Sequence, residues 1–140
     1  MHYKEAEKAA RIRLVPVEGN ELALLPLGNF STQGCSYVQP WNFYGVHIML
    51  VDGYIARIDI KNSYTKTDKG ITYYSSPADV KGYYGKNSQI TTSKKGSEKV
   101  TFKPPEAPNH RLVFHSNALT LHRFSIGRLP EIEPEENGCL

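Results

Sequence analysis

One stretch of the chain leaves little freedom about its fold: GVHIMLVDGYIARIDI, residues 45–60. Two apolar runs, 46–51 and 54–60, flank the dipeptide Asp52-Gly53. Both residues of this dipeptide tolerate a positive φ, which the tight type I′ turn between antiparallel strands requires. The stretch therefore predicts a β-hairpin.

The second strand of this hairpin alternates in polarity. Its apolar set is Tyr54, Ala56, Ile58 and Ile60, and the residues between them are Ile55, Arg57 and Asp59. Because successive side chains of a strand point to opposite faces, we expect one apolar face and one mixed face.

Two short helices are predicted on either side of the hairpin. In the first, within residues 1–15, Tyr3, Ala6 and Ala10 share a face, and Pro16 and Gly19 end the helix. The second lies in GITYYSSPADVKGYYG, residues 70–85.

The second helix carries strong signals at both ends. Ser76 is the expected N-cap, Pro77 the first helical residue and Asp79 the third, and Gly85 lies past the end. We expect an apolar stripe to pack on the hairpin, formed by Val80, Tyr83 and Tyr84.

The remaining apolar segments predict further strands, at 21–25, 89–92, 99–103, 110–116 and 118–127. The length of 140 residues fits one domain. We therefore expect a single α+β domain over residues 1–140, with an antiparallel sheet of five to seven strands built from hairpins. The two short helices would pack on one face of that sheet, and residues 130–140 would form an acidic tail.

Charge argues against a nucleic-acid partner. The net charge is only +3, from 17 basic and 14 acidic residues. The basic run of Lys94, Lys95, Lys99 and Lys103 and the acidic tail of Glu131, Glu133, Glu135 and Glu136 are most simply a solvated loop and a solvated tail.

Hydropathy predicts a soluble chain. No window reaches the 18 or more apolar residues of a transmembrane segment. The N-terminus also has no apolar core of a secretory signal, so either the protein is cytoplasmic or the sequence starts downstream of a signal.

Three segments together resemble a widespread group of small exported bacterial proteins, mostly uncharacterised. They are GYIARIDI, TDKGITYYSSPADVKGYYG and HRLVFHSNALTLHRFSIGRLPEIEPEENGC. The group shows an R-I-D-V strand, a G-I-x-x-x-S-x-x-x-V-x-x-x-Y-G segment and a G-R-L-P run before a closing Glu-Gly-Cys, from which Asn137 departs. The likeness covers residues 35–139.

The resemblance implies a secreted or periplasmic protein. Members carry a signal peptide and a leading strand that ends in Met, and this chain begins at that Met, so we expect the first strand to be missing. The two helix-containing segments would then be weakly similar repeats. At the level of fold they are similar to those of β-lactamase-inhibitor proteins and small outer-membrane-assembly lipoproteins.

For an exported protein, the two cysteines would form one disulfide, between Cys35 and Cys139, that ties down the acidic tail. The alternative is two free thiols in a cytoplasmic protein.

A search for catalytic groups finds no constellation. The histidines, His2, His47, His110, His115 and His122, lack metal-ligand spacing. No phosphate-binding glycine loop is present, so we predict no metal, no cofactor and no enzyme activity. A small cytoplasmic enzyme that uses Cys35 or a histidine is the alternative.

The segment YVQPWNFYG, residues 37–45, is the candidate interaction surface, with Tyr37, Trp41, Phe43 and Tyr44. Exposed aromatic residues anchor protein interfaces. They also cap cores, and the sequence favours burial against the sheet edge. No Lys or Arg lies between Gln33 and His47 to support a nucleic-acid platform.

The leading functional expectation is a non-enzymatic exported domain that binds a protein or a cell-envelope component. A structural accessory subunit of an envelope assembly is a further alternative, and the oligomeric state stays open.

Overall fold

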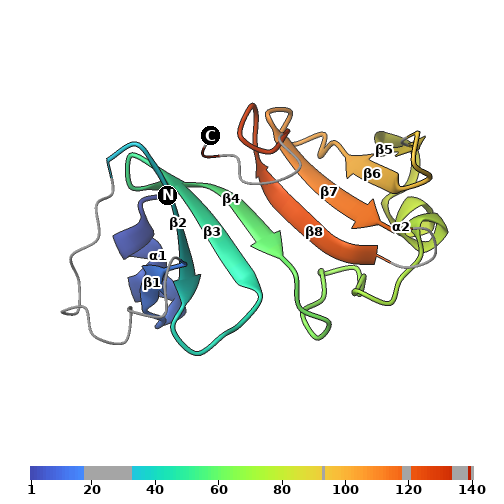
Figure 1. Ribbon diagram of the computed structural model, residues 1–140. Coiled ribbons are helices and arrows are strands. Elements are labelled where there is room, and N and C mark those ends of the chain that lie inside the picture. Colours follow the sequence, from blue (N-terminus) through green and yellow to red (C-terminus); the bar gives the residue numbers. More distant parts are fainter. Residues whose placement is uncertain (18–32, 93, 118–120, 134–138, 140) are drawn as a thin grey trace.

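The computed structural model describes residues 1–17, 33–92, 94–117, 121–133 and 139, and it consists of two successive units of one helix and four strands (Figure 1). The first unit contains α1 (Tyr3–Ala10), β1 (Leu14–Pro16), β2 (Cys35–Pro40), β3 (Val46–Val51) and β4 (Tyr54–Ile60). The second contains α2 (Pro77–Tyr84), a 3-10 turn (Gly85–Asn87), β5 (Ser88–Thr92), β6 (Glu98–Phe102), β7 (His110–Ser116) and β8 (Leu121–Arg128).

All strands belong to one antiparallel sheet with the order β1-β2-β3-β4-β8-β7-β6-β5. The last strands of the two units, β4 and β8, pair at the centre, where Ile58 lies opposite Ile126 (Figure 1). The predicted α+β class is therefore confirmed, but the described part of the sheet has eight strands and not five to seven.

Two of the eight strands were not foreseen. β1 has only three residues, too few for a pattern, and β2 ends in Pro40, a residue that counts against a strand. The strand predicted at 21–25 lies outside the described residues, as do the first residues of the strand predicted at 118–127.

The hairpin between β3 and β4 has the predicted turn, because Asp52 and Gly53 both have positive φ angles of 50° and 81°. Its face alternation is only partly as predicted. A β-bulge between Met49 and Leu50 sets Leu50 opposite Ile55. Tyr54 therefore lies on the opposite face from Ile58 and is exposed.

The first helix is shorter than predicted. It begins at a capping box formed by His2 and Glu5, and it ends at Arg11, which adopts the left-handed conformation. Instead of continuing toward Pro16, the chain enters β1, where the Leu14 amide donates to Glu7 Oε1 at 2.8 Å. Arg11, and not a proline, is therefore the helix stop.

The second helix has the predicted caps. The Asp79 amide donates to Ser76 Oγ at 3.1 Å, and the Ser76 amide donates to the Asp79 carboxylate at 2.8 Å. Its predicted stripe is partly wrong, because Tyr83 is exposed whereas Val80 is fully buried. The helix also packs mainly on β5, β6 and β7, and not on the hairpin of β3 and β4 as predicted. Tyr84 completes the packing, with its ring 4.7 Å from that of Phe102 between centroids.

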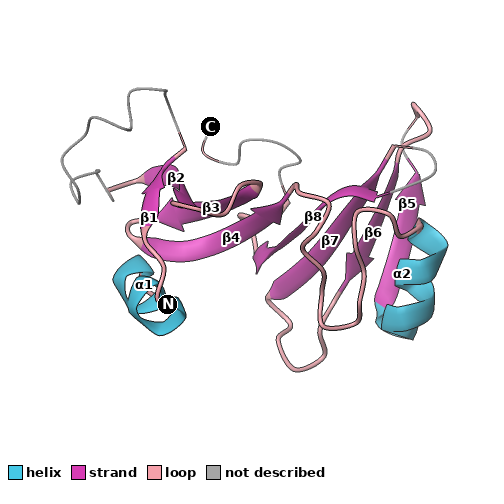
Figure 2. Ribbon diagram, turned by 90° about the horizontal axis from the view of Figure 1, so that it is seen from below, coloured by secondary structure: helices cyan, strands magenta, loops and turns pink. Residues whose placement is uncertain are grey.

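The core lies on one face of the sheet, between the strands and both helices (Figure 2). Alternate residues of the central strands point into it, except where register shifts in the β3–β4 and β7–β8 pairs displace the alternation by one residue. The helices contribute Tyr3 and Val80, and the strand residues in the core include Ile48, Leu50, Phe114 and Phe124. Neither of the two described helices lies over the opposite sheet face, which carries Arg57, Asp59, His115 and Ser125.

Candidate interaction surface

Three of the four predicted surface residues lie in the loop between β2 and β3. Trp41 is 49% exposed, Phe43 44% and Tyr44 75%. Tyr37 is separate from them: it lies within β2, opposite Met49, and is half-buried.

The favoured expectation, burial of this loop against the sheet edge, is therefore wrong. The edge of β2 is already occupied, because β1 pairs along it and Leu14 lies opposite Pro40. The aromatic side chains of the loop remain in solvent.

A second loop holds this one in place. In the segment after β4, the Asn62 side-chain amide donates to the Tyr44 carbonyl at 3.0 Å, and the Tyr64 hydroxyl donates to the same oxygen at 2.9 Å. The ring of Tyr64 also meets Phe43 edge to face, with 5.5 Å between centroids. We call Trp41, Phe43, Tyr44 and Tyr64 the aromatic cluster.

Gly45 allows the two loops to come this close. Its φ is +76°, and a Cβ at this position would lie 2.8 Å from Asn62 Cβ. The Lys61 amide donates to the Gly45 carbonyl at 2.7 Å. The cluster is therefore supported by backbone contacts as well as by ring contacts.

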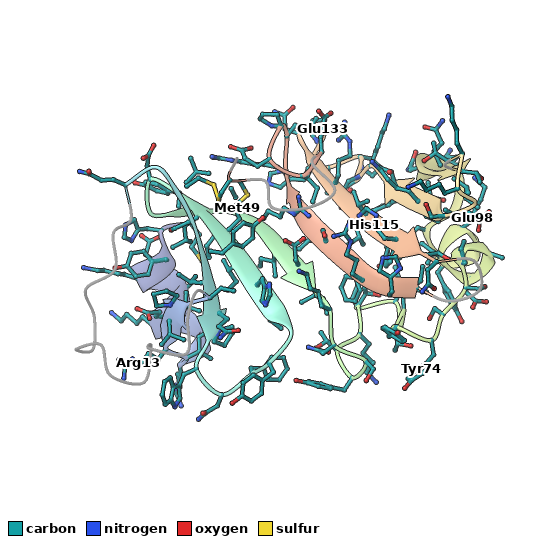
Figure 3. All side chains as sticks on the ribbon, in the orientation of Figure 1. Arg13, Met49, Tyr74, Glu98, His115 and Glu133 are labelled. Atoms are coloured by element: carbon teal, nitrogen blue, oxygen red, sulfur yellow. A yellow bond between two sulfur atoms is a disulfide. The ribbon has the colours of Figure 1, made fainter. Side chains whose placement is uncertain are left out.

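The side chain of Arg13, the residue just before β1, lies beside this surface. The guanidinium carbon of Arg13 lies 6.0 Å from the Trp41 ring centroid, and the Trp41 amide donates to the Arg13 carbonyl at 2.9 Å. Figure 3 labels Arg13 at this end of the molecule. The sequence search missed Arg13 and Tyr64, because they lie far along the chain from the loop and carry no local signal.

The sheet face opposite the helices holds a buried polar network. Arg57 Nε lies 2.7 Å from Asp59 Oδ1, and the Ser125 hydroxyl donates to that same oxygen. Arg57 is 1% exposed and Asp59 4%. A guanidinium beside a carboxylate offsets the cost of burying both charges. The Asp59 carboxylate neutralises Arg57 and accepts a hydrogen bond from the Ser125 hydroxyl. We therefore interpret this network as one that stabilises the fold.

The same network contacts the C-terminal segment. Arg57 Nη1 donates to the Glu131 carbonyl at 3.4 Å, and Arg128 and Glu131 form an ion pair at 2.9 Å. Further along, Cys35 and Cys139 are joined in a disulfide with 5.2 Å between their Cα atoms. With its sulfur bonded, Cys35 has no free thiol to act as a nucleophile.

Two histidines lie together on this face. The rings of His115 and His122 are 6.3 Å apart between centroids. Burial, followed by the positive charges of the nearby Arg123 and Lys99, lowers the pKa of His115 to about 3. Burial also lowers the pKa of His122 and of His47. In the described ranges, no three His, Cys, Asp or Glu residues are grouped as metal ligands would be.

Comparisons with known proteins return no match, whether to a protein-family model, to a curated protein or to a solved structure. The family resemblance therefore stays a prediction. Within the described residues, neither helix is long and apolar enough to cross a membrane.

Proposed function

We propose that this protein is a non-enzymatic domain of the periplasm or cell exterior that binds a protein or another cell-envelope component through the aromatic cluster. The observation that carries the proposal is the exposure of Trp41, Phe43 and Tyr44. Their loop is held by hydrogen bonds from Asn62 and Tyr64. Large apolar side chains rarely gather in solvent without a partner to cover them.

The chemistry of the cluster suits protein recognition. Each aromatic side chain buries about 150–250 Å² in an interface, and Trp, Tyr and Arg are the residues that most often dominate binding energy. Arg13 beside Trp41 adds a charged donor at the rim. Because Asn62 and Tyr64 already hold the loop, little ordering entropy is lost on binding.

The compartment is inferred from the cysteines. A disulfide that links residues 104 positions apart persists in an oxidising environment and is rare in the reducing cytoplasm. The family resemblance points the same way. Both support export.

Binding is tested by partner capture from an envelope fraction. The protein is immobilised, and Trp41→Ala is compared with Tyr83→Ala, which removes an exposed aromatic ring from α2. We expect Trp41→Ala to lose a stoichiometric partner and Tyr83→Ala to retain it. Both variants should melt within a few degrees of the wild type. Capture that is equal for both variants would refute the role of the cluster.

The compartment is tested by the intact mass of protein recovered from its native cells, before and after reduction. An envelope fraction whose mass rises by about 2 Da on reduction, from one opened S–S bond, supports export. Free thiols in a cytoplasmic fraction would contradict it and would reopen an enzyme that uses Cys35.

A further inference from the structure

The sheet face opposite the helices has a groove of about 300 Å³ at its β5–β7 end. Residues of β5, β6 and β7 line one side, and the C-terminal segment lines the other through Leu129, Ile132 and Glu133. The groove lies away from the aromatic cluster: Figure 3 shows Glu133 near the top centre of the molecule and Arg13 at the lower left. It is therefore a separate surface.

Three cations line the groove against one carboxylate. Lys99 and Lys103 are four residues apart on β6, so they point to the same face. Arg111 lies beside Lys103, because each adjoins the register pair Phe102–Leu112. Across the described ranges, no carboxylate comes within ion-pair distance of any of the three.

The structure fixes one of these cations at the rim. Arg111 Nη1 donates to the carbonyls of Pro108 and His110 at 2.6 and 2.7 Å. These bonds use one nitrogen of the guanidinium and set its direction. A positioned guanidinium is a suitable donor for carboxylate or phosphate oxygens.

Positively charged side chains continue along the same sheet face beyond the groove. His115 lies opposite Lys99 on one side and Arg123 on the other. Its pKa is lowered first by burial and then by Arg123, Lys99, His122 and Arg57. A site surrounded by cations on three strands attracts small anions.

The floor between the cations is apolar. Val113, opposite Thr101, is 4% exposed, and Ile132 is also 4% exposed. Thr101 and Thr91 add hydroxyl groups at the side. A volume of about 300 Å³ is at the small end of ligand pockets.

We propose that this groove binds a small organic oxyanion, a carboxylate or a phosphate monoester, with its charge at Lys99, Lys103 and Arg111 and its apolar part over Val113 and Ile132. The proposal does not depend on the function of the aromatic cluster. It also explains the basic run: its last two lysines lie in the groove, and Lys94 and Lys95 lie in the turn before β6.

The proposal is tested by titrating the ¹⁵N-labelled protein at low salt and following backbone amide shifts. The probes are benzoate, phenyl phosphate and inorganic phosphate, with benzyl alcohol as the uncharged control. We expect saturable shifts at Thr101, Val113 and Ile132 with benzoate or phenyl phosphate. The tighter of the two identifies the oxyanion, and weaker binding of inorganic phosphate shows the use of the apolar floor. Lack of saturation with both organic anions would overturn the proposal.

Charge variants supply the matched control. Lys103→Met should weaken binding by about tenfold or more, since a hydrogen bond to a charged group is lost. Lys86→Met removes the same charge from the turn after α2, outside the groove, and should change affinity less than twofold. Lys99→Met is the second groove variant if Lys103→Met alters the spectrum of the free protein. Equal affinities for groove and control variants, or equal binding of benzyl alcohol, would overturn the proposal.

Discussion

Single charged residues are buried on the sheet face opposite the helices, whereas the core face is mainly apolar. Arg57 and Asp59 neutralise each other. His115 has no carboxylate partner among the described residues, and its register neighbours are Lys99 and Arg123. It is therefore kept neutral in the folded protein, and this has a consequence for stability.

We expect the free energy of unfolding to fall as the pH falls below about 6.5. The pKa of His115 is about 3 in the folded protein and about 6.5 when unfolded, so between these values the unfolded chain binds more protons. The loss is at most about 1.4 kcal/mol per pH unit from this residue. Urea unfolding between pH 7 and pH 4 measures it.

Two substitutions separate His115 from other causes of acid sensitivity. His115→Gln should flatten the pH dependence, and His110→Gln, at an exposed position, should keep the wild-type slope. An unchanged slope in His115→Gln would show that this histidine is not the source.

The close approach at Gly45 gives a second prediction at this scale. Gly45→Ala combines a positive φ with a contact of 2.8 Å to Asn62 Cβ, and it should destabilise by about 1–3 kcal/mol. Gly82→Ala is the control: its Cβ meets nothing within 4 Å in the middle of α2, so it should stabilise by roughly 0.5–1 kcal/mol. Thermal unfolding of both variants, compared with the wild type, measures these changes in stability. A neutral Gly45→Ala would mean that the two loops do not touch.

At the scale of elements, the molecule is two meanders joined through β4 and β8. The junction is tight at Gly127, which lies opposite Arg57. A Cβ there would be 2.7 Å from the Ala56 carbonyl and 3.0 Å from Arg57 Cα. Only a residue without a side chain lets the strands pair at this point.

Gly127→Ala should therefore cost about 1–3 kcal/mol, since the added methyl presses on backbone atoms that cannot turn away. In hydrogen exchange, the backbone amides of β4 and β8 should be the first to lose protection. Ile126→Val, at a half-exposed neighbour on the same strand, should cost less than about 0.5 kcal/mol. Equal losses of stability in the two variants would contradict the close contact of β4 and β8 at Gly127.

Elements with local chemical signals were predictable from the sequence, and elements that depend on distant partners were not. Asp52-Gly53 and the Ser76–Asp79 caps act within a few residues, so the turn and α2 were found with nearly correct bounds. β1 has no such signal, because it exists through pairing with β2. The bulge at Met49 likewise depends on the fit of two strands.

At the scale of the whole molecule, the C-terminal segment is tied to the first unit and lies against the second. Cys139 is bonded to Cys35 at the start of β2, and Ile132 and Glu133 border the groove over β5–β7. The candidate surface was partly predictable: Trp41, Phe43 and Tyr44 came from one dense segment, whereas Tyr64 and Arg13 reach it only through the fold.

Opening this link should destabilise the protein markedly. A disulfide that closes a loop of 104 residues restricts the unfolded chain by on the order of 4–5 kcal/mol. The double variant Cys35→Ser, Cys139→Ser should unfold at a much lower urea concentration than the oxidised protein, with both measured at pH 7. Adding reductant should lower the midpoint of the wild type and leave that of the variant unchanged. Equal midpoints for oxidised wild type and variant would show that the link adds no stability.

The most direct test of the binding surface is a photo-crosslink in the native cells. Tyr44, 75% exposed in the aromatic cluster, is replaced by p-benzoylphenylalanine, and Tyr83, 63% exposed on α2, is replaced in the matched control. We predict one discrete adduct from position 44, absent from position 83 and abolished when Trp41→Ala is added. Adducts that are equal at the two positions, or that persist without Trp41, would contradict a binding surface at the aromatic cluster.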